Sequence, residues 1–551
     1  MSGTQELPRL YDCRGSRSLK TVEYKGRFLY SKYDPAKVTE SAIEHLTILP
    51  GTLVLVCSPV LWHGYSKLES SMPADCQVLA LEDDENLYEL ARQGAPQGVA
   101  LLRLDQRNQI DSFVRKLCST GRIKRSLRVD FSAGVSLAKS RYDFTAGAIA
   151  ELIATFWKNR ITLARFGRLF SRNFLKNTAH LGSSYLIEDV ARCVSKPVLV
   201  CGAGESLDSV DFVSLVRDEF FIIAVDAAFP ALSSRGVFPD AICALESQVA
   251  IEKSYIGLAH EIKEHDITLI ADLCSRNEVA ALFHRKVWVA TRYADARFLD
   301  RLHQCGIVEH FAEPMGSVGL LAVAAALVLR STPDVPVFVC GMDFAFSVGR
   351  THAKGSEAHR RRLFNCTRTT TIEDATSSFA FGAQEVTCKS GTTARTTKIL
   401  SQYAAQFKAM FAGQQNLFDC TTFGQDLGLA HKSICSCYRV TQARSPTLSC
   451  KGDVTRGDAA RQFLLDEKAS LMRLKDLLAK GQASSFREEG ITLGDQIEHL
   501  ASEREYLFLH FPDGFAFKSD PSFLHRVRAE IDYFLKQLDI ALATNTDRRR
   551  G

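Results

Sequence analysis

The sequence predicts an α/β fold with a central Rossmann-like domain built on a parallel sheet, preceded by a smaller α/β domain and followed by a helical domain. Short apolar runs alternate with helix-length segments between residues 183 and 440, as the doubly buried strands of a parallel sheet do. After residue 441, three segments carry apolar residues at spacings of three and four, which is typical of packed helices. We therefore expect domains at residues 1–125, 183–440 and 441–551, with a helical connector at 126–182.

The composition is that of an ordinary globular chain. Its 551 residues are 46% hydrophobic and 24% charged, and a net charge of +5 without a lysine-rich tail gives no support to a nucleic-acid partner. The amino terminus lacks an apolar signal-like stretch, and no run reaches the roughly 18 to 20 apolar residues of a membrane span. We expect a cytoplasmic protein that does not bind membranes.

The sixteen cysteines predict packed free thiols rather than disulfides. Several of them lie in or just after apolar strand-like runs: Cys57, Cys201, Cys243 and Cys340. A thiol there packs as a small hydrophobic group, which favours a reducing compartment. Cys435 and Cys437 are separated by one residue and have no second pair at zinc-ligand spacing, so we expect no structural metal.

The amino-terminal domain shows a β-α-β pattern. The apolar strands "TLVLVC" and "CQVLALE" flank a loop and a short helix, as in one half of a Rossmann-type domain. The first loop, "SPVLWHG", lacks the glycine spacing that admits a pyrophosphate, although Glu82 stands where a ribose-binding acid would be. A retained scaffold is the preferred interpretation over a cofactor site.

Helices are expected in the connector and in the last domain. The segment "AIAELIATFWKNRITLARFGRLFSRNFLKN" alternates apolar and basic residues at helical spacing, and its basic residues are interpreted as a solvated face. The last domain shows three helical stripes, broken by Gly481 and by Pro512 to Gly514. It contains no catalytic cluster, so packing, oligomerisation or partner docking is its expected use.

Polar residues in the central domain gather at predicted strand ends. They follow the first strand at Gly202 to Ser206, the second at Asp226, and the last at Gly341 and Asp343. Ligands of open parallel sheets bind at the carboxyl ends of the strands. These residues therefore mark the expected ligand-binding edge.

The turn "CGAGES" after the first strand is a candidate phosphate loop. Gly202 and Gly204 leave no Cβ in the way, so amides of the turn can face an anion, and Ser206 can cap the next helix or donate to a phosphate. Glu205 argues against a phosphate, because like charges repel. A turn that needs glycine for geometry alone remains an equal interpretation.

The segment "VFVCGMDFAFSVGRTHAKG" adds titratable groups. His352 follows Asp343 by nine residues, in a loop that also carries Arg350 and Lys354. The chain to about residue 395 is rich in Gly, Ser, Thr and Arg, including Arg360 to Arg362, and suits a lid over an acidic or phosphorylated ligand. A solvated basic loop with a surface histidine is the alternative.

Several blocks together resemble the motility accessory factor proteins, which are implicated in O-glycosylation of flagellin with nonulosonic sugars. The blocks are "VCGAGESLD", "IIAVDAAFPALSSRGVFPDAICALES", "PMGSVGLLAVAAALVL", "VFVCGMDFAFSVGRTHAKG" and "VTCKSGTTARTTKILSQYAAQF". They span about residues 196–428. The same region resembles archaeal-type 6-hydroxymethylpterin pyrophosphokinases (MptE-like proteins) and, more distantly, bacterial sialyltransferases.

The resemblance implies a glycosyltransferase that moves a nonulosonic acid from a CMP-activated donor to flagellin Ser or Thr, without an obligatory metal or cofactor. It implies donor-binding roles for Gly202, Gly204, Ser206, Asp226, Gly316, Ser317 and Gly341, and places Asp343 and His352 at the reacting centre. With a pKa near neutrality, His352 would be the base, and Asp343 would orient it or bind the donor. The family's loop usually has proline at Glu205 and aspartate at Glu246, so donor choice or catalysis is expected to differ. A non-catalytic flagellar assembly protein and a pterin pyrophosphokinase stay open as alternatives.

Overall fold

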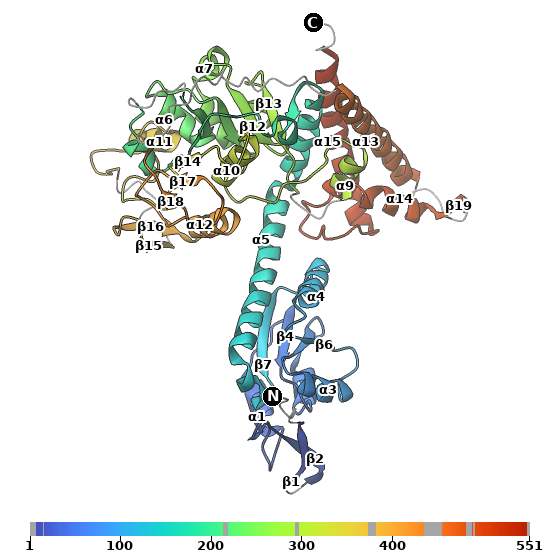
Figure 1. The fold of residues 1–551 in the computed structure, drawn as a ribbon. Coiled ribbons are helices and arrows are strands. Elements are labelled where there is room, and N and C mark those ends of the chain that lie inside the picture. The colour runs from blue at the N-terminus through green and yellow to red at the C-terminus, as the bar shows by residue number, and fades with distance from the viewer. Residues whose placement is uncertain are drawn as a thin grey trace. The chain divides into compact units, whose positions relative to one another are not determined.

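A computed structural model describes residues 7–14, 16–212, 219–292, 297–372, 382–434, 454–480, 487–488 and 491–547 (Figure 1). Cys435, Cys437 and Gly481 lie outside these ranges. The chain divides into two compact units, Met1–Gly167 with Phe508–Phe517, and Arg168–Leu507 with Lys518–Gly551. The long helix α5 (Lys139–Thr178) falls within the predicted connector and contributes residues to both units.

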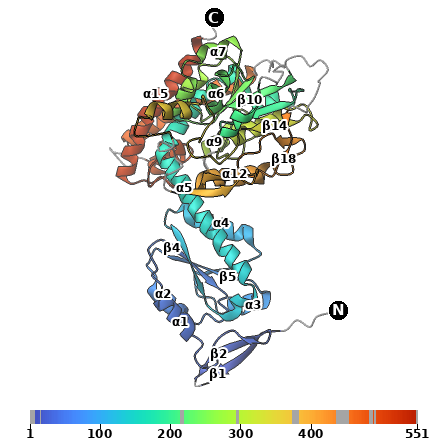
Figure 2. The same ribbon diagram turned by 90° about the vertical axis from the view of Figure 1, so that its left-hand side faces the viewer.

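The first unit has a parallel sheet in the order β6-β5-β4-β7 and a small antiparallel sheet in the order β1-β2-β3 (Figure 2). Its elements before α5 are β1 (Arg9–Cys13), β2 (Ser16–Tyr24), β3 (Arg27–Phe28), α1 (Lys37–Glu44), β4 (Thr52–Cys57), α2 (Tyr65–Ser71), β5 (Gln77–Glu82), α3 (Glu85–Gln93), β6 (Ala100–Arg103), α4 (Arg107–Ser119) and β7 (Arg125–Asp130). All six residues of the apolar strand β4 are buried, as the sequence pattern predicts. The segment Phe508–Phe517 packs in this unit, with Phe515 against Phe156 and Trp157.

The acid at the end of β5 is part of the interior of this unit. Glu82 is 1% exposed, and its carboxylate accepts hydrogen bonds from the Tyr142 hydroxyl at 2.8 Å and the Asp83 amide at 2.9 Å. Burial raises the pKa of Glu82 to about 7. The hydroxyl of Tyr30 contacts the loop after β4 and donates to the carbonyl of Pro59 at 2.6 Å. Glu82 and the loop after β4 are thus bonded to groups of the protein itself.

The second unit contains the large sheet. Its described strands run in the order β18-β17-β14-β9-β10-β11-β12-β13-β8, and each neighbouring pair is parallel. The strands are β8 (Tyr185–Leu186), β9 (Val198–Cys201), β10 (Phe221–Val225), β11 (Ala241–Ala244), β12 (Thr268–Asp272), β13 (Lys286–Val289), β14 (Val337–Cys340), β17 (Leu417–Asp419) and β18 (Ala430–His431). The chain moves to opposite sides of β9 to form β10 and β14, so a topological switch point lies there.

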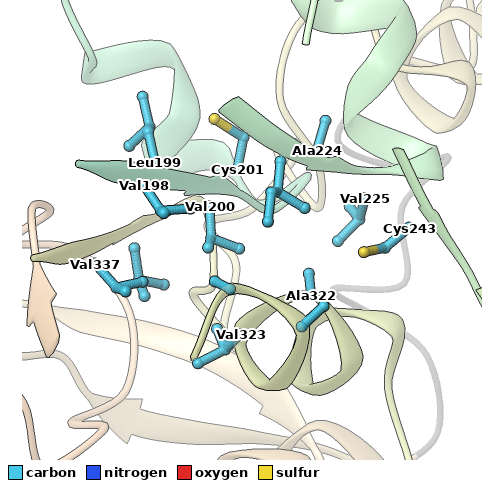
Figure 3. Packing of buried hydrophobic residues seen from close by; sticks show 14 of the residues in the cluster. Val198, Leu199, Val200, Cys201, Ala224, Val225, Cys243, Ala322, Val323 and Val337 are labelled. Atoms are coloured by element: carbon cyan, nitrogen blue, oxygen red, sulfur yellow. The ribbon is translucent and has the colours of Figure 1, made fainter. Parts of the chain in front are cut away.

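Helices and a small hairpin complete this part of the unit. They are α6 (Phe229–Ser233), α7 (Ala259–Glu264), α8 (Asn277–Ala280), α9 (Arg297–Gln304), α10 (Val318–Leu329), α11 (Glu357–Asn365), β15 (Ala383–Thr387), β16 (Thr393–Thr397) and α12 (Lys398–Phe411). The apolar helix α10 packs on the sheet, and Figure 3 shows Ala322 and Val323 of this helix in one cluster with Val200 of β9 and Val337 of β14. The neighbouring thiols of Cys201 and Cys340 are buried in the same core, and all described cysteines are free.

The carboxy-terminal region is helical, with α13 (Val454–Lys480), β19 (Arg487–Glu488), β20 (Ile491–Thr492), α14 (Leu493–Ser502) and α15 (Pro521–Asp547). Glu467 of α13 is fully buried and pairs with the guanidinium groups of Arg301 and Arg504, while the Tyr506 hydroxyl donates to it at 2.7 Å. A buried carboxylate requires such partners because desolvation is costly. This cluster links α9, α13 and the segment after α14.

The predicted fold class is confirmed: the parallel-sheet region is preceded by a smaller α/β region and followed by helices. The predicted domain boundaries stay a prediction, and the last of them, between residues 440 and 441, lies outside the described residues. None of the helices within the described ranges is long and apolar enough to cross a bilayer.

Candidate functional site

A cleft of about 260 Å³ lies at the carboxyl ends of β9 and β14, at the switch point of the large sheet. Six of the residues predicted for the site line it: Gly202, Gly204, Ser317, Gly341, Asp343 and His352. Ser206, Asp226 and Gly316 lie next to lining residues but are not part of the wall. The sheet order brings these groups together from strands that are far apart in the sequence.

The glycine turn closes tightly on the turn after β14. The amide of Gly202 donates to the carbonyl of Cys340, and that of Gly204 to the carbonyl of Gly341, both at 2.8 Å. A Cβ on Gly202 would lie 2.3 Å from the Gly341 oxygen, so glycine is needed for this approach. The amides of Gly202 and Gly204 are therefore already bonded, and the expectation that they face an anion is wrong. Ala203 lines the cleft between them, and no hydrogen bond of the described residues uses its amide.

Asp343 is held by Ser206. The Ser206 amide donates to Asp343 Oδ2 at 2.8 Å, its hydroxyl donates to Oδ1, and the same hydroxyl accepts from the Gly341 amide at 3.2 Å. Burial raises the pKa of Asp343 to about 7, although the Ser206 bonds and the charge of Lys389 oppose this. Ser206 is thus committed to Asp343 and does not serve as a free phosphate donor.

Two carboxylates that follow the glycine turn hold the loop that carries His352. Glu205 accepts from the amide of Ser347 at 2.7 Å and from its hydroxyl at 2.8 Å. Asp208 accepts from the Lys354 amide at 3.0 Å, and the Ala353 amide donates to the carbonyl of Ala203 at 2.9 Å. Glu205 does not line the cleft, so its charge serves the loop instead of facing a ligand.

His352 is partly exposed in the cleft wall. Its Nδ1 lies 3.0 Å from the Thr351 hydroxyl, and no hydrogen bond between His352 and Asp343 occurs among the described residues. Burial, with a contribution from the charge of Arg362, lowers the pKa of His352 to about 4. The expected near-neutral pKa is therefore wrong, and Asp343 is not in place to orient the ring.

Asp226 follows β10 beside the cleft, between the lining residues Val225 and Ala227. Its carboxylate accepts from the amide of Ala227 at 2.6 Å. Burial raises the pKa of Asp226 to about 7, and the charge of the exposed Glu246 adds to the increase. Glu246 acts on Asp226 through its charge and is not one of the residues that line the cleft.

The Gly-Ser turn before α10 brings a helix amino terminus to the cleft. The Ser317 hydroxyl accepts from the Gly319 amide at 3.2 Å and caps the helix, and Val318 lines the wall. The amide of Gly316 instead donates to the side chain of Gln406 at 3.1 Å. Ser317 is placed at the cleft as predicted, whereas Gly316 supports the neighbouring helix α12.

Sequence reasoning did not identify Lys389, Asp419 and Gly424 as neighbours of Asp343. The amino group of Lys389 pairs with Asp419, whose side chain is 5% exposed at the end of β17, and the charge of Lys389 reaches Asp343. A Cβ on Gly424 would lie 2.6 Å from the Asp343 Cα. The apolar run before Asp419 is a detectable signal of a further strand end. In the portion of the chain that the structure describes, no group of three or more metal-ligating side chains is assembled.

Comparisons with known proteins agree with this architecture. Residues 172–349 match the family model described as 6-hydroxymethylpterin diphosphokinase MptE-like. An uncharacterized protein of Treponema pallidum (strain Nichols) is 33% identical over 550 residues, covering 94% of this chain and 93% of that protein. The structure of the Maf glycosyltransferase from Magnetospirillum magneticum AMB-1 matches with a TM-score of 0.54 and 14% identity, over 99% of this chain and 93% of that chain. The resemblance to motility accessory factor proteins is thus confirmed at the level of the fold.

Proposed function

Because this chain belongs to one family with the Treponema pallidum protein and has the fold of a Maf glycosyltransferase, we propose that it is a glycosyltransferase. Its proposed donor is a CMP-activated nonulosonic acid, and its acceptor is a Ser or Thr hydroxyl of flagellin. The observation that carries the proposal is the switch-point cleft, where Asp343 and His352 share one wall with the amino terminus of α10. A sugar nucleotide suits a cleft at this edge of a parallel sheet.

The donor would bind with its phosphate near Ser317 and Val318, where the first amides of α10 and its dipole favour an anion. The acceptor oxygen attacks the anomeric carbon, the bond from that carbon to the phosphate oxygen breaks, and CMP leaves with the electron pair. The acceptor proton moves to His352 Nε2, which requires Nδ1 to carry a proton and donate to Thr351. A low pKa keeps His352 neutral at pH 7 and thus free to accept this proton.

Asp343 has a separate part in this proposal. It lines the cleft and is fixed by the amide and hydroxyl of Ser206, so it holds the glycine turn against the end of β14. That arrangement supports a role in shaping the donor site, with His352 as the base.

A 6-hydroxymethylpterin diphosphokinase is the second candidate, because residues 172–349 match that family model. It would transfer pyrophosphate from ATP to a pterin alcohol and should bind ATP with Mg²⁺. A protein that binds flagellin without catalysis is the third. The three differ in ligand and in product, so one set of measurements separates them.

The test combines ligand binding with product mass. The purified chain should gain thermal stability with CMP or CDP and little with NAD, S-adenosylmethionine or ATP with Mg²⁺. Incubation with unmodified flagellin and a CMP-activated nonulosonic acid should raise the intact mass of flagellin by whole sugar units. Binding of flagellin with unchanged mass would support the non-catalytic candidate, and pyrophosphorylated pterin would support the kinase.

A further inference from the structure

A cluster of charged groups lies around the loop from residue 352 to 359. We call it the lid cluster and define it as Arg235, Lys354 and Arg362 together with Asp208 and His359. The Arg235 guanidinium pairs with Asp208 and donates to the carbonyl of Lys354 at 3.2 Å. Burial lowers the pKa of His359. The positive charges of Arg362 and Lys354 lower this pKa further, and the negative charge of Asp208 opposes this, so all three charges lie in the neighbourhood of this ring.

The charges of the lid cluster do not balance. The cluster contains three cations and one carboxylate, Asp208, which is already bonded to Arg235 and to the Lys354 amide. Neither Arg362 nor Lys354 forms an ion pair with a side chain of the described residues. Among the described residues, the cluster therefore keeps a net positive charge.

Two N–H groups of the cluster also lack an acceptor. Nη1 of Arg235 and Nη1 of Arg362 are both buried, and neither has a hydrogen-bond partner in the described structure. A buried donor without an acceptor is costly, and guanidinium groups match the oxygens of phosphates and carboxylates. Two such donors beside a surplus of positive charge favour an oxyanion ligand.

The lid cluster adjoins the cleft. His352 lines the cleft, the Ala353 amide donates to the carbonyl of the lining residue Ala203 at 2.9 Å, and α11, which carries Arg362, begins at Glu357 a few residues later. Arg360 and Arg361 on the same helix, α11, are exposed to solvent. Of the three consecutive arginines, Arg362 alone is partly buried and has a buried guanidinium nitrogen without a hydrogen-bond partner in the described structure.

We propose that Arg235, Lys354 and Arg362 form an oxyanion subsite beside the cleft, with Arg362 as the residue that contacts the ligand directly. The inference rests on the proposed function, since the oxyanion belongs to its substrate: the phosphate of the nucleotide or the carboxylate of the sugar acid. It goes further by assigning the substrate's negative charge to this cluster.

Arg362→Gln tests the subsite, and Arg361→Gln is the matched control because it removes the same charge from an exposed position of the same helix. Calorimetry measures the binding of CMP, cytidine, N-acetylneuraminate and CMP-N-acetylneuraminate to both variants and the wild type. We expect Arg362→Gln to raise the Kd of the charged probes at least about tenfold and Arg361→Gln to change it less than about twofold. Circular dichroism checks that each variant is folded.

The pattern across the probes identifies the group that is bound. A loss for CMP but not for N-acetylneuraminate assigns the subsite to the phosphate, and the reverse assigns it to the carboxylate. Equal affinities in the two variants overturn the subsite while leaving the proposed function in place. A wild type that binds none of the probes overturns both. If Arg362→Gln does not fold, Lys354→Gln at an exposed position replaces it, with an expected increase in Kd of about threefold or more against the same control.

Discussion

Asp343 and His352 should give the second unit two opposite dependences of stability on pH. Asp343 has a pKa of about 7 when folded against 3.8 for the free group, so between these values the folded state binds more protons and stability falls as pH rises. His352 has a pKa of about 4 against 6.5, so the unfolded state binds more protons and stability rises with pH. The same cleft therefore contains two groups whose effects oppose each other.

The sizes follow from the linkage relation. One pKa unit corresponds to about 1.36 kcal/mol. Raising the pH from 5 to 7 therefore lowers the contribution of Asp343 to the free energy of unfolding by about 2 kcal/mol, which is less than the full two units because the slope weakens near pH 7. Over the same interval the contribution of His352 rises by about 2 kcal/mol, since most of its effect is complete by pH 7. The two contributions to the free energy of unfolding nearly cancel in the wild type. Substitution of one residue therefore makes the pH dependence of the other visible.

The assay is urea unfolding at pH 5, 6 and 7, followed by tryptophan fluorescence. The chain has three tryptophans, and a background with Trp62→Phe and Trp157→Phe leaves Trp288, which is buried in β13 of the second unit. Relative to this background, the free energy of unfolding of Asp343→Asn should rise by about 2 kcal/mol from pH 5 to 7. That of His352→Gln should fall by about 2 kcal/mol over the same range. Asp226 is unchanged in every variant, so its titration cancels in the differences. Parallel pH curves for a variant and the background would refute the assignment for that residue.

Three further predictions concern the turn, the loop and the base. Gly204→Ala places a Cβ 2.5 Å from Asp343 Oδ2 and should lower the free energy of unfolding in urea by about 1–3 kcal/mol. The control Gly147→Ala, in α5 with open space around it, should be neutral or stabilising. Equal effects of the two substitutions would contradict the close approach at Gly204. Glu205→Gln weakens the bonds to Ser347 and should slow transfer with little change in the Kd of CMP, while tighter CMP binding would mean that Glu205 faces the ligand. His352→Ala should reduce glycan transfer by about 10² to 10⁴ and leave CMP affinity nearly intact. The acid limb of the wild-type pH profile should lie near the pKa of about 4 and vanish in this variant, and a loss below about tenfold would remove His352 as the base.

The strand ends of the large sheet could be predicted from sequence because each apolar strand is followed by polar residues, and parallel strands expose these ends at one edge. This reasoning predicts Gly202, Gly341 and Asp343 at that edge, whereas His352 is predicted from its loop nine residues after Asp343. What could not be predicted is that β14 lies directly beside β9, since strand order is decided by packing between distant segments. The bond between Ser206 and Asp343 depends entirely on that order.

The same limit explains the errors on pKa and on the turn amides. A sequence shows that a histidine follows a strand, but the desolvation that lowers its pKa depends on what packs around it, including Arg362 from α11. The glycines of the turn were correctly associated with a close approach. Their amides, however, donate to the carbonyls of Cys340 and Gly341 and not to a phosphate. Geometry and ligand binding impose the same residue type, so the sequence alone cannot separate them.

The carboxylates after the glycine turn show how an acidic loop can coexist with a ligand of negative charge. Glu205 accepts hydrogen bonds from the amide and hydroxyl of Ser347. Asp208 pairs with Arg235 and accepts from the Lys354 amide, so protein groups stabilise the charge of each carboxylate. Removal of both would free two ends of the segment that carries His352. These bonds fix the loop beside the cleft, and in the proposed oxyanion subsite the surplus of cations would attract an anion. An acid in a phosphate-type turn is therefore compatible with anion binding when its lone pairs are directed at the protein.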